Sequence, residues 1–175
     1  MKYLFILSAF ILSQSSFAQT VLGTGCDQTS SVVQINRART AINVSFSKFK
    51  VSHNGAALDR STCNLALPVM VPAGKKLVIY KITIKESYKL SPHSKVKLAV
   101  SAFFPGQPGE TLAQTLSNDS GQVVLSKKVR VVSGCGESTI VRFNSSLTMM
   151  SEQGAYHSDK ASISSVGLAL KFVDC

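Results

Sequence analysis

Apolar and polar residues alternate with a period of two through much of this chain, and this pattern constrains its fold more than any other feature. Apolar side chains occupy every second position in 42–46, 96–104 and 166–172. Such alternation is typical of strands with one buried and one exposed face, and helical periodicity is nearly absent. We expect further strands at 31–35, 63–67, 78–84, 122–125, 128–132 and 139–144.

Two of these strands carry specific expectations. In 78–84, the spacing predicts that Val78, Tyr80, Ile82 and Ile84 share one face. The strand at 63–67 is expected to stop at Pro68, because proline has no N–H group for a ladder hydrogen bond.

Turn signals such as Pro72-Ala73-Gly74, Pro105-Gly106 and Asn118-Asp119-Ser120-Gly121 separate the expected strands. Roughly nine short strands predict an all-β fold in which two antiparallel sheets pack face to face as a sandwich. Jelly-roll and immunoglobulin-like topologies both fit this pattern. We expect residues 105–116 to form a long loop, and we find no internal repeat and no second domain.

The N-terminus predicts export. Lys2 precedes an apolar run over 3–12, and small residues stand at Ser16 and Ala18, which is typical of a secretory signal peptide cleaved after Ala18. The run is too short to cross a bilayer as a helix, and no later segment is apolar enough to do so. We therefore predict a signal peptide at 1–18 and a single domain at 19–175. The expected location is secreted or extracellular, with the periplasm as the alternative.

Four cysteines follow the predicted signal, namely Cys26, Cys63, Cys135 and Cys175. An even number of cysteines in an oxidising compartment favours two disulfides, and four cysteines permit three pairings. We prefer Cys26–Cys63 and Cys135–Cys175, because these pairs close loops of similar length at the two ends of the chain. The wide spacing, without a C-x-x-C pair, argues against a zinc site.

The surroundings of the cysteines resemble those of a known family. The matching elements are Gly25-Cys26, Arg60-Ser61-Thr62-Cys63-Asn64-Leu65, Pro72-Ala73-Gly74, Ser133-Gly134-Cys135-Gly136 and the terminal Cys175. In their order and spacing they resemble domain-of-unknown-function family 4360, a family of small exported proteins. The resemblance implies a secreted, disulfide-linked domain and implies no activity or catalytic residue.

The sequence carries no pattern typical of an enzyme or a cofactor site. There is no G-x-S-x-G segment, no glycine-rich phosphate loop, and no cluster among the nine acidic residues. His53, His93 and His157 are isolated from one another and from other metal-ligating residues. We therefore predict no catalytic residue, no metal site and no cofactor.

The chain is basic, with a formal charge of +10, and seven lysines fall within residues 75–97 beside one acid, Glu86. If 86–94 connect two strands as a hairpin, these lysines merge into one exposed patch. The candidate binding residues are Lys76, Lys81, Lys85, Lys95 and Lys97. Such a patch attracts an anionic glycan, an envelope polyanion or an acidic protein. Alternatively, the lysines only line a solvent face or protect a sheet edge.

Nucleic acid fits the chain poorly, since it has five arginines and no aromatic residues interleaved with the lysines. We interpret the protein as a secreted, disulfide-stabilised β-sandwich of unknown molecular function, and favour a non-catalytic binding or surface component. The alternatives are a small secreted hydrolase whose site is assembled from dispersed residues, and an inhibitor or effector that presents the loop at 105–116.

Overall fold

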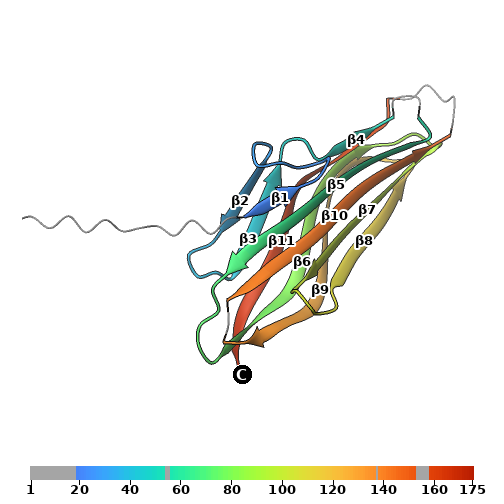
Figure 1. Ribbon diagram of the computed structural model, residues 1–175. Coiled ribbons are helices and arrows are strands. Elements are labelled where there is room, and N and C mark those ends of the chain that lie inside the picture. The colour runs from blue at the N-terminus through green and yellow to red at the C-terminus, as the bar shows by residue number, and fades with distance from the viewer. Residues whose placement is uncertain (1–18, 54–55, 137, 153–157) are drawn as a thin grey trace, which may run out of the picture.

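Two antiparallel β-sheets pack face to face in the computed structural model (Figure 1), which describes residues 19–53, 56–136, 138–152 and 158–175. The all-β sandwich predicted from the alternation is therefore confirmed. The predicted signal peptide and His157 lie outside the described residues. Within the described part, no helix is long and apolar enough to cross a membrane.

Each sheet is assembled from strands that are distant in sequence. The first sheet has the order β1 (Thr20–Leu22), β5 (Leu58–Val69), β10 (Thr139–Ser151), β7 (Ser94–Phe103) and β8 (Glu110–Ser117). The second has the order β2 (Ser31–Ile35), β3 (Ala41–Phe46), β11 (Lys160–Asp174), β6 (Lys75–Lys89) and β9 (Ser120–Cys135), and β4 (Lys50–Ser52) also pairs with β11. Among these strands, only β2–β3 and β7–β8 are neighbours both in sequence and in a sheet.

The core lies between the two inner faces and contains the alternating apolar residues. In β7, Val96, Leu98, Val100 and Ala102 are fully buried, as the sequence pattern predicts. The largest fully buried side chains include Phe49, Phe104 and Phe143. Burying a side chain of this kind stabilises the fold by roughly 1.5–3 kcal/mol, so this layer holds the sheets together.

The prediction for the face of β6 is wrong in its first half. Leu77 and Ile79 are fully buried, whereas Tyr80 is exposed; Ile82 and Ile84 point inward as expected. The reason is a register shift against β11, in which Ile79 pairs with Leu170 but Lys81 pairs with the next residue, Ala169. Tyr80 is the extra residue of a β-bulge, and one extra residue exchanges the two faces of a strand.

Two other expectations are also wrong. Strand β8 occupies most of the predicted loop at 105–116, because 110–117 pairs with β7 as an edge strand. Strand β5 does not stop at Pro68 but continues to Val69. Since β1 pairs with β5 only as far as Ala66, one side of β5 has no ladder partner at Pro68, where a missing N–H group is tolerated.

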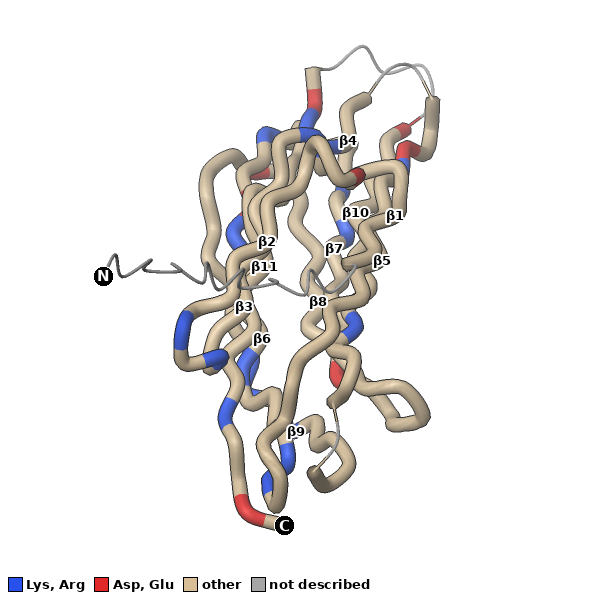
Figure 2. Tube along the Cα trace, turned by 60° about the vertical axis from the view of Figure 1, so that its left-hand side comes forward, with Lys and Arg blue, Asp and Glu red and all other residues tan. Residues whose placement is uncertain are grey.

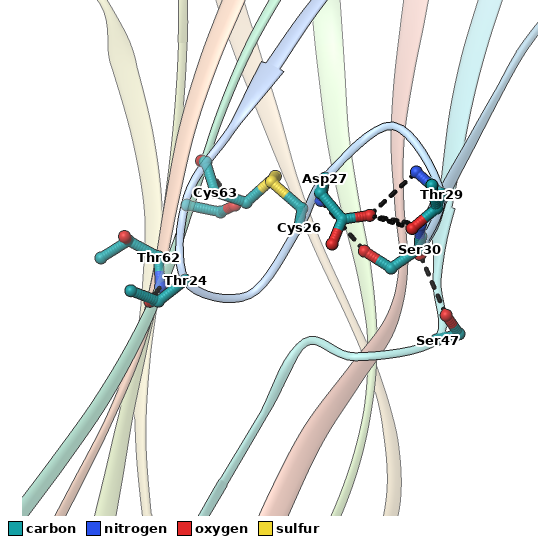
Figure 3. Close-up of a disulfide and its surroundings, with 9 residues drawn as sticks. Thr24, Cys26, Asp27, Thr29, Ser30, Ser47, Thr62 and Cys63 are labelled. Carbon is teal, nitrogen blue, oxygen red and sulfur yellow. Dashed lines mark hydrogen bonds between the residues drawn. A yellow bond between two sulfur atoms is a disulfide. The ribbon is translucent and has the colours of Figure 1, made fainter.

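Two disulfides stabilise opposite regions of the sandwich, and they are the two pairs preferred from the sequence. Cys26–Cys63 joins the β1–β2 connection to β5, with Cα atoms 5.4 Å apart. Around it, Asp27 accepts hydrogen bonds from the backbone N–H groups of Thr29 and Ser30 at 2.8 and 2.7 Å (Figure 3). This bridge therefore secures the crossover from the first sheet to the second.

Cys135–Cys175 connects the ends of β9 and β11, with Cα atoms 5.9 Å apart. These two strands flank β6 on either side. The bridge therefore spans the beginning of β6 and limits how far its two neighbours can separate.

Candidate functional site

The structure divides the predicted lysine patch between the two sheets. Strands β6 and β7 do not form a hairpin, because β6 belongs to the second sheet and β7 to the first. The connection between them crosses the end of the sandwich, where Leu90 is buried and the backbone N–H of Ser91 donates to Asp159. Lys95 and Lys97 therefore lie on the outer face of the first sheet, away from the lysines of β6.

The β6 lysines instead lie beside cations from other strands of the second sheet. Its outer face, which we call the basic face, carries Lys50 of β4, Lys76, Lys81, Lys85 and Lys89 of β6, Lys128 and Arg130 of β9, and Lys160 and Lys171 of β11. Figure 2 shows the two layers, with β2, β3, β11 and β6 together on one side. Of the predicted binding residues, Lys76, Lys81 and Lys85 belong to this face.

Two pairs of lysines stand directly opposite each other on the basic face. Lys89 of β6 pairs in register with Lys160 of β11, and Lys81 of β6 pairs with Lys128 of β9. Side chains in such positions start from Cβ atoms about 5 Å apart, and like charges there destabilise a sheet. These two lysine pairs therefore lower the free energy of unfolding.

Carboxylates do little to neutralise this face. The six strands of the second sheet contain two of them, Glu86 and Asp174. Glu86 points into the core and is 1% exposed. Asp174 accepts a hydrogen bond from Lys75 Nζ, which lowers the pKa of its carboxyl group. The basic face thus has a strong local excess of positive charge.

The first depression on this face lies across β4, β11 and β6 and has a volume of about 470 Å³. The side chains of Ser52, Ser87 and Ser162 lie on the outer face of the sheet and line this depression, which we call the serine depression. Lys50, Lys89 and Lys160 surround these hydroxyl groups. Hydroxyl and ammonium groups are hydrogen-bond donors, so the site suits an anionic group.

The second depression lies near the other end of the face, across β9, β6 and β11, and has a volume of about 420 Å³. Tyr80 lines it, and we call it the tyrosine depression. Lys76, Arg130 and Lys171 contribute cations, and Lys171 Nζ lies 6.0 Å from the centre of the Tyr80 ring. The tyrosine depression combines an exposed aromatic ring with positive charge.

A family profile covers residues 18–175 of the chain. The chain belongs to the family described as Domain of unknown function (DUF4360). The resemblance inferred from the surroundings of the cysteines is thereby confirmed. Membership in this family assigns no activity, and a comparison with curated proteins finds no match.

Solved structures provide distant likenesses to this DUF4360 protein. One is TmCBM61 in complex with beta-1,4-galactotriose, with 13% identity, a TM-score of 0.38, and coverage of 90% of this chain and 88% of that chain. Another is a Family 11 Carbohydrate-Binding Module from Clostridium thermocellum, with 9% identity, a TM-score of 0.26, and coverage of 87% and 84%. The infectious bursal disease virus Gx strain structure has 12% identity, a TM-score of 0.35, and coverage of 90% and 32%. At these TM-scores the likenesses carry no argument about function.

Sequence reasoning missed the contributions of β4, β9 and β11 to the basic face of this DUF4360 protein. Lys171 stands between the buried Leu170 and the partly buried Phe172, so alternation alone indicates that it points outward. Nothing in the sequence indicates that β11 lies beside β6, because that pairing joins residues far apart in the chain.

The histidines do not form a metal site in the described part of the chain, where no group of three histidine, cysteine or acidic residues is close enough to hold an ion. His93 Nδ1 lies 2.9 Å from Glu152 Oε2, and the backbone N–H of His53 donates to the carbonyl of Asp159. None of these four residues belongs to the described lining of either depression, although His53 and Asp159 directly adjoin Ser52 and Lys160 of the serine depression.

Proposed function

We propose that this protein is a non-catalytic binding domain whose basic face holds a linear acidic polysaccharide. The observation that carries the proposal is that two pairs of lysines stand directly opposed, Lys89–Lys160 and Lys81–Lys128. Like charges in such positions weaken the sheet. An anionic ligand placed between them converts the repulsion into attraction.

Protection of a sheet edge accounts for Lys128, which lies on the edge strand β9, but not for the other three lysines. Edge strands often carry lysine because it discourages pairing with another chain. However, Lys89 and Lys81 lie on β6, and Lys160 lies on β11, and both strands have hydrogen-bonded neighbours on each side. Solubility alone also explains the arrangement poorly, since it does not require charges of one sign to stand in register.

The basic face is long enough to contact several charges of a polymer. From Lys76 to Lys89, strand β6 extends over about 40 Å, at about 3.3 Å per residue. Lys81 and Lys85 lie between these ends, and the two depressions lie near them. A linear chain that follows β6 meets cations along its whole path.

The surface chemistry favours a saccharide over a nucleic acid. Single-stranded nucleic acids bind to grooves in which successive bases stack on aromatic side chains. Among the aromatic residues of the second sheet, Phe46, Tyr88 and Phe172 pack against the core, which leaves Tyr80 on the outer face. One exposed aromatic ring does not support stacking along a strand. Export, as predicted from the N-terminus, also places the protein where polysaccharides are the more accessible polyanions.

The two alternatives receive less support from the described residues. A hydrolase that acts on a sugar needs a pair of carboxylates beside its ligand. The serine depression has no acidic or histidine side chain in its described lining, and the tyrosine depression has one carboxylate, Asp174. An effector that presents a loop at 105–116 is weakened because 110–117 is strand β8.

The test measures binding of polygalacturonate by calorimetry at two sodium chloride concentrations, with neutral dextran as a reference. We expect Lys81→Gln/Lys128→Gln to weaken binding about tenfold and to reduce its salt dependence, because fewer counterions are displaced. The matched control is Lys95→Gln/Lys97→Gln, which removes the same charge from the other sheet. The proposal is wrong if both double variants weaken binding equally, or if the unmodified protein does not bind polygalacturonate more tightly than dextran.

A further inference from the structure

We propose that the tyrosine depression is a subsite for a single sugar ring that carries an acidic group, with Tyr80 contacting the ring and the surrounding cations contacting the acid. This inference rests on the proposed function, since it names the part of the polysaccharide that the basic face selects. The remainder of the face then attracts the polymer by charge, and this subsite distinguishes a sugar acid from other polyanions.

The β-bulge in β6 is what brings Tyr80 to the surface. In a regular strand, Tyr80 would share the buried face of Ile82 and Ile84. Because Tyr80 is inserted between the residues that pair with Leu170 and Ala169, its side chain turns outward and is 42% exposed. Bulges commonly redirect one side chain, and they are frequent beside functional sites.

The surroundings of Tyr80 combine apolar and cationic surfaces. The half-buried Val129 and Val132 supply apolar surface in the lining, and Lys76, Arg130 and Lys171 supply positive charge. The volume of about 420 Å³ lies within the range of small-molecule sites, which are mostly apolar with a few placed polar groups. The depression thus offers two kinds of contact within the space of one ring-sized ligand.

A pyranose ring with an acidic substituent matches both kinds of contact. One face of such a ring presents C–H groups, which pack against an aromatic surface. Its carboxylate or sulfate accepts paired hydrogen bonds from a guanidinium group such as that of Arg130. Because Lys171 Nζ lies 6.0 Å from the centre of the Tyr80 ring, an acid bound to Lys171 keeps the attached sugar close to Tyr80.

The geometry of the subsite is held by the second disulfide. Arg130 lies on β9 and Lys171 on β11, on opposite sides of Tyr80. Cys135–Cys175 connects the ends of these two strands. Asp174 also lines the depression, but Lys75 compensates part of its charge through their hydrogen bond. The strand positions that carry Arg130 and Lys171 are therefore fixed relative to Tyr80 before the ligand arrives, which reduces the cost of assembling the subsite.

The experiment compares Tyr80→Leu with Tyr80→Phe, using oligogalacturonate and inorganic polyphosphate as probes. Tyr80→Leu keeps apolar volume and removes the ring, whereas Tyr80→Phe keeps the ring. We expect Tyr80→Leu to lose about tenfold in affinity for oligogalacturonate, similar to the loss of an aromatic stacking contact. Its affinity for polyphosphate, which has no ring, stays unchanged. Tyr80→Phe binds both probes as the unmodified protein does, and thermal unfolding verifies that each variant is folded.

The outcomes separate this inference from the proposed function. If Tyr80→Leu binds both probes as tightly as the unmodified protein does, the proposed subsite is wrong, whereas the proposed binding of polysaccharide by the basic face is not contradicted. If Tyr80→Leu weakens both probes equally, Tyr80 supports the sheet and does not contact a sugar, and the subsite is again wrong. If the unmodified protein binds neither probe at low salt, both proposals fail together.

Discussion

The carboxyl group of Glu86 lies among the apolar side chains of the core. It belongs to β6 and points away from the basic face. Neither of its oxygen atoms has a hydrogen-bond partner among the described residues. Burial disfavours the ionised form and raises the pKa of Glu86 to about 7. The protein therefore keeps a proton at Glu86 that the unfolded chain loses at lower pH.

This difference predicts that the folded state becomes less stable as pH rises from about 4.5 to about 7. In that window the unfolded state has released its proton while the folded state retains it, so the free energy of unfolding falls with pH. The contribution of one group is at most about 1.4 kcal/mol per pH unit. Urea unfolding measured at several pH values checks this, and Glu86→Gln is expected to flatten the slope.

A suitable control for Glu86→Gln is Glu110→Gln, which removes a solvent-accessible carboxylate that contacts Lys127 at 3.2 Å. Exposed ion pairs of this kind contribute about 0–1 kcal/mol. The control is expected to retain the pH slope of the unmodified protein. An unchanged slope in Glu86→Gln would contradict the assignment of the pH dependence to this residue.

At the scale of strands, β6 combines two tasks. Its inward residues fill the core, and its outward lysines contribute to the basic face. Since Lys89 stands opposite Lys160, the strand carries a repulsion that a different residue would relieve. Stability and binding are therefore expected to oppose each other at this position.

Lys89→Glu is the corresponding prediction. It places a carboxylate opposite Lys160, which is expected to raise the free energy of unfolding by roughly 0.2–1 kcal/mol at low salt. The same change is expected to weaken binding of polygalacturonate, because the serine depression loses a cation. Thermal unfolding and calorimetry on the same samples measure both effects.

Lys97→Glu on β7 provides the comparison for Lys89→Glu. Lys97 pairs with Thr148 and Thr115, so the new carboxylate gains no directly opposed cation. We expect little change in stability or binding from it. A gain in stability equal to that of Lys89→Glu would mean that overall charge, and not the cross-strand repulsion, is responsible.

A side chain of the edge strand β9 bridges the gap between the two sheets. Lys127 occupies an inward position, since it pairs with the buried Ile82. Its ammonium group lies 3.2 Å from Glu110 Oε2 and donates to the carbonyl of Thr111 at 2.9 Å. Both partners belong to β8 of the other sheet, so this lysine connects two edge strands across the gap. An inward-pointing charge also discourages pairing with another chain at this edge.

For the whole molecule, the two disulfides differ in accessibility more than in the loops they close. They span 37 and 40 residues, so chain entropy gives each a similar stabilisation of about 4 kcal/mol. Cys26 and Cys63 are buried, whereas Cys135 and Cys175 are exposed. A dissolved thiol therefore reaches the second bridge more easily.

We predict that stepwise reduction opens Cys135–Cys175 first. Differential alkylation followed by peptide mapping shows the order directly. The partly reduced protein is expected to remain folded, since the core and the first bridge are intact. It is also expected to lose preference for oligogalacturonate over polyphosphate, because β9 and β11 are no longer tied beside Tyr80. Alkylation of Cys26 or Cys63 before Cys135 would contradict the prediction.

Regular alternation is what made parts of this fold predictable. Val96, Leu98, Val100 and Ala102 alternate without interruption, and the structure buries all four. The alternation predicts an inward Tyr80, which is wrong because a bulge depends on how β6 meets β11, and residues 78–84 themselves show no signal of it. Closeness in sequence predicts one patch for the lysines of β6 and β7, yet the connection between these strands changes sheets.

Local pattern was sufficient to determine the all-β class, the sandwich and the outward direction of most charged residues. A residue's side of a strand depends on its immediate neighbours, so this information is contained in short stretches of sequence. The basic face, the opposed lysine pairs and the exposure of Tyr80 were decided only by the tertiary structure. They depend on which distant strands become neighbours and in which register, and those choices minimise the free energy of the whole core at once.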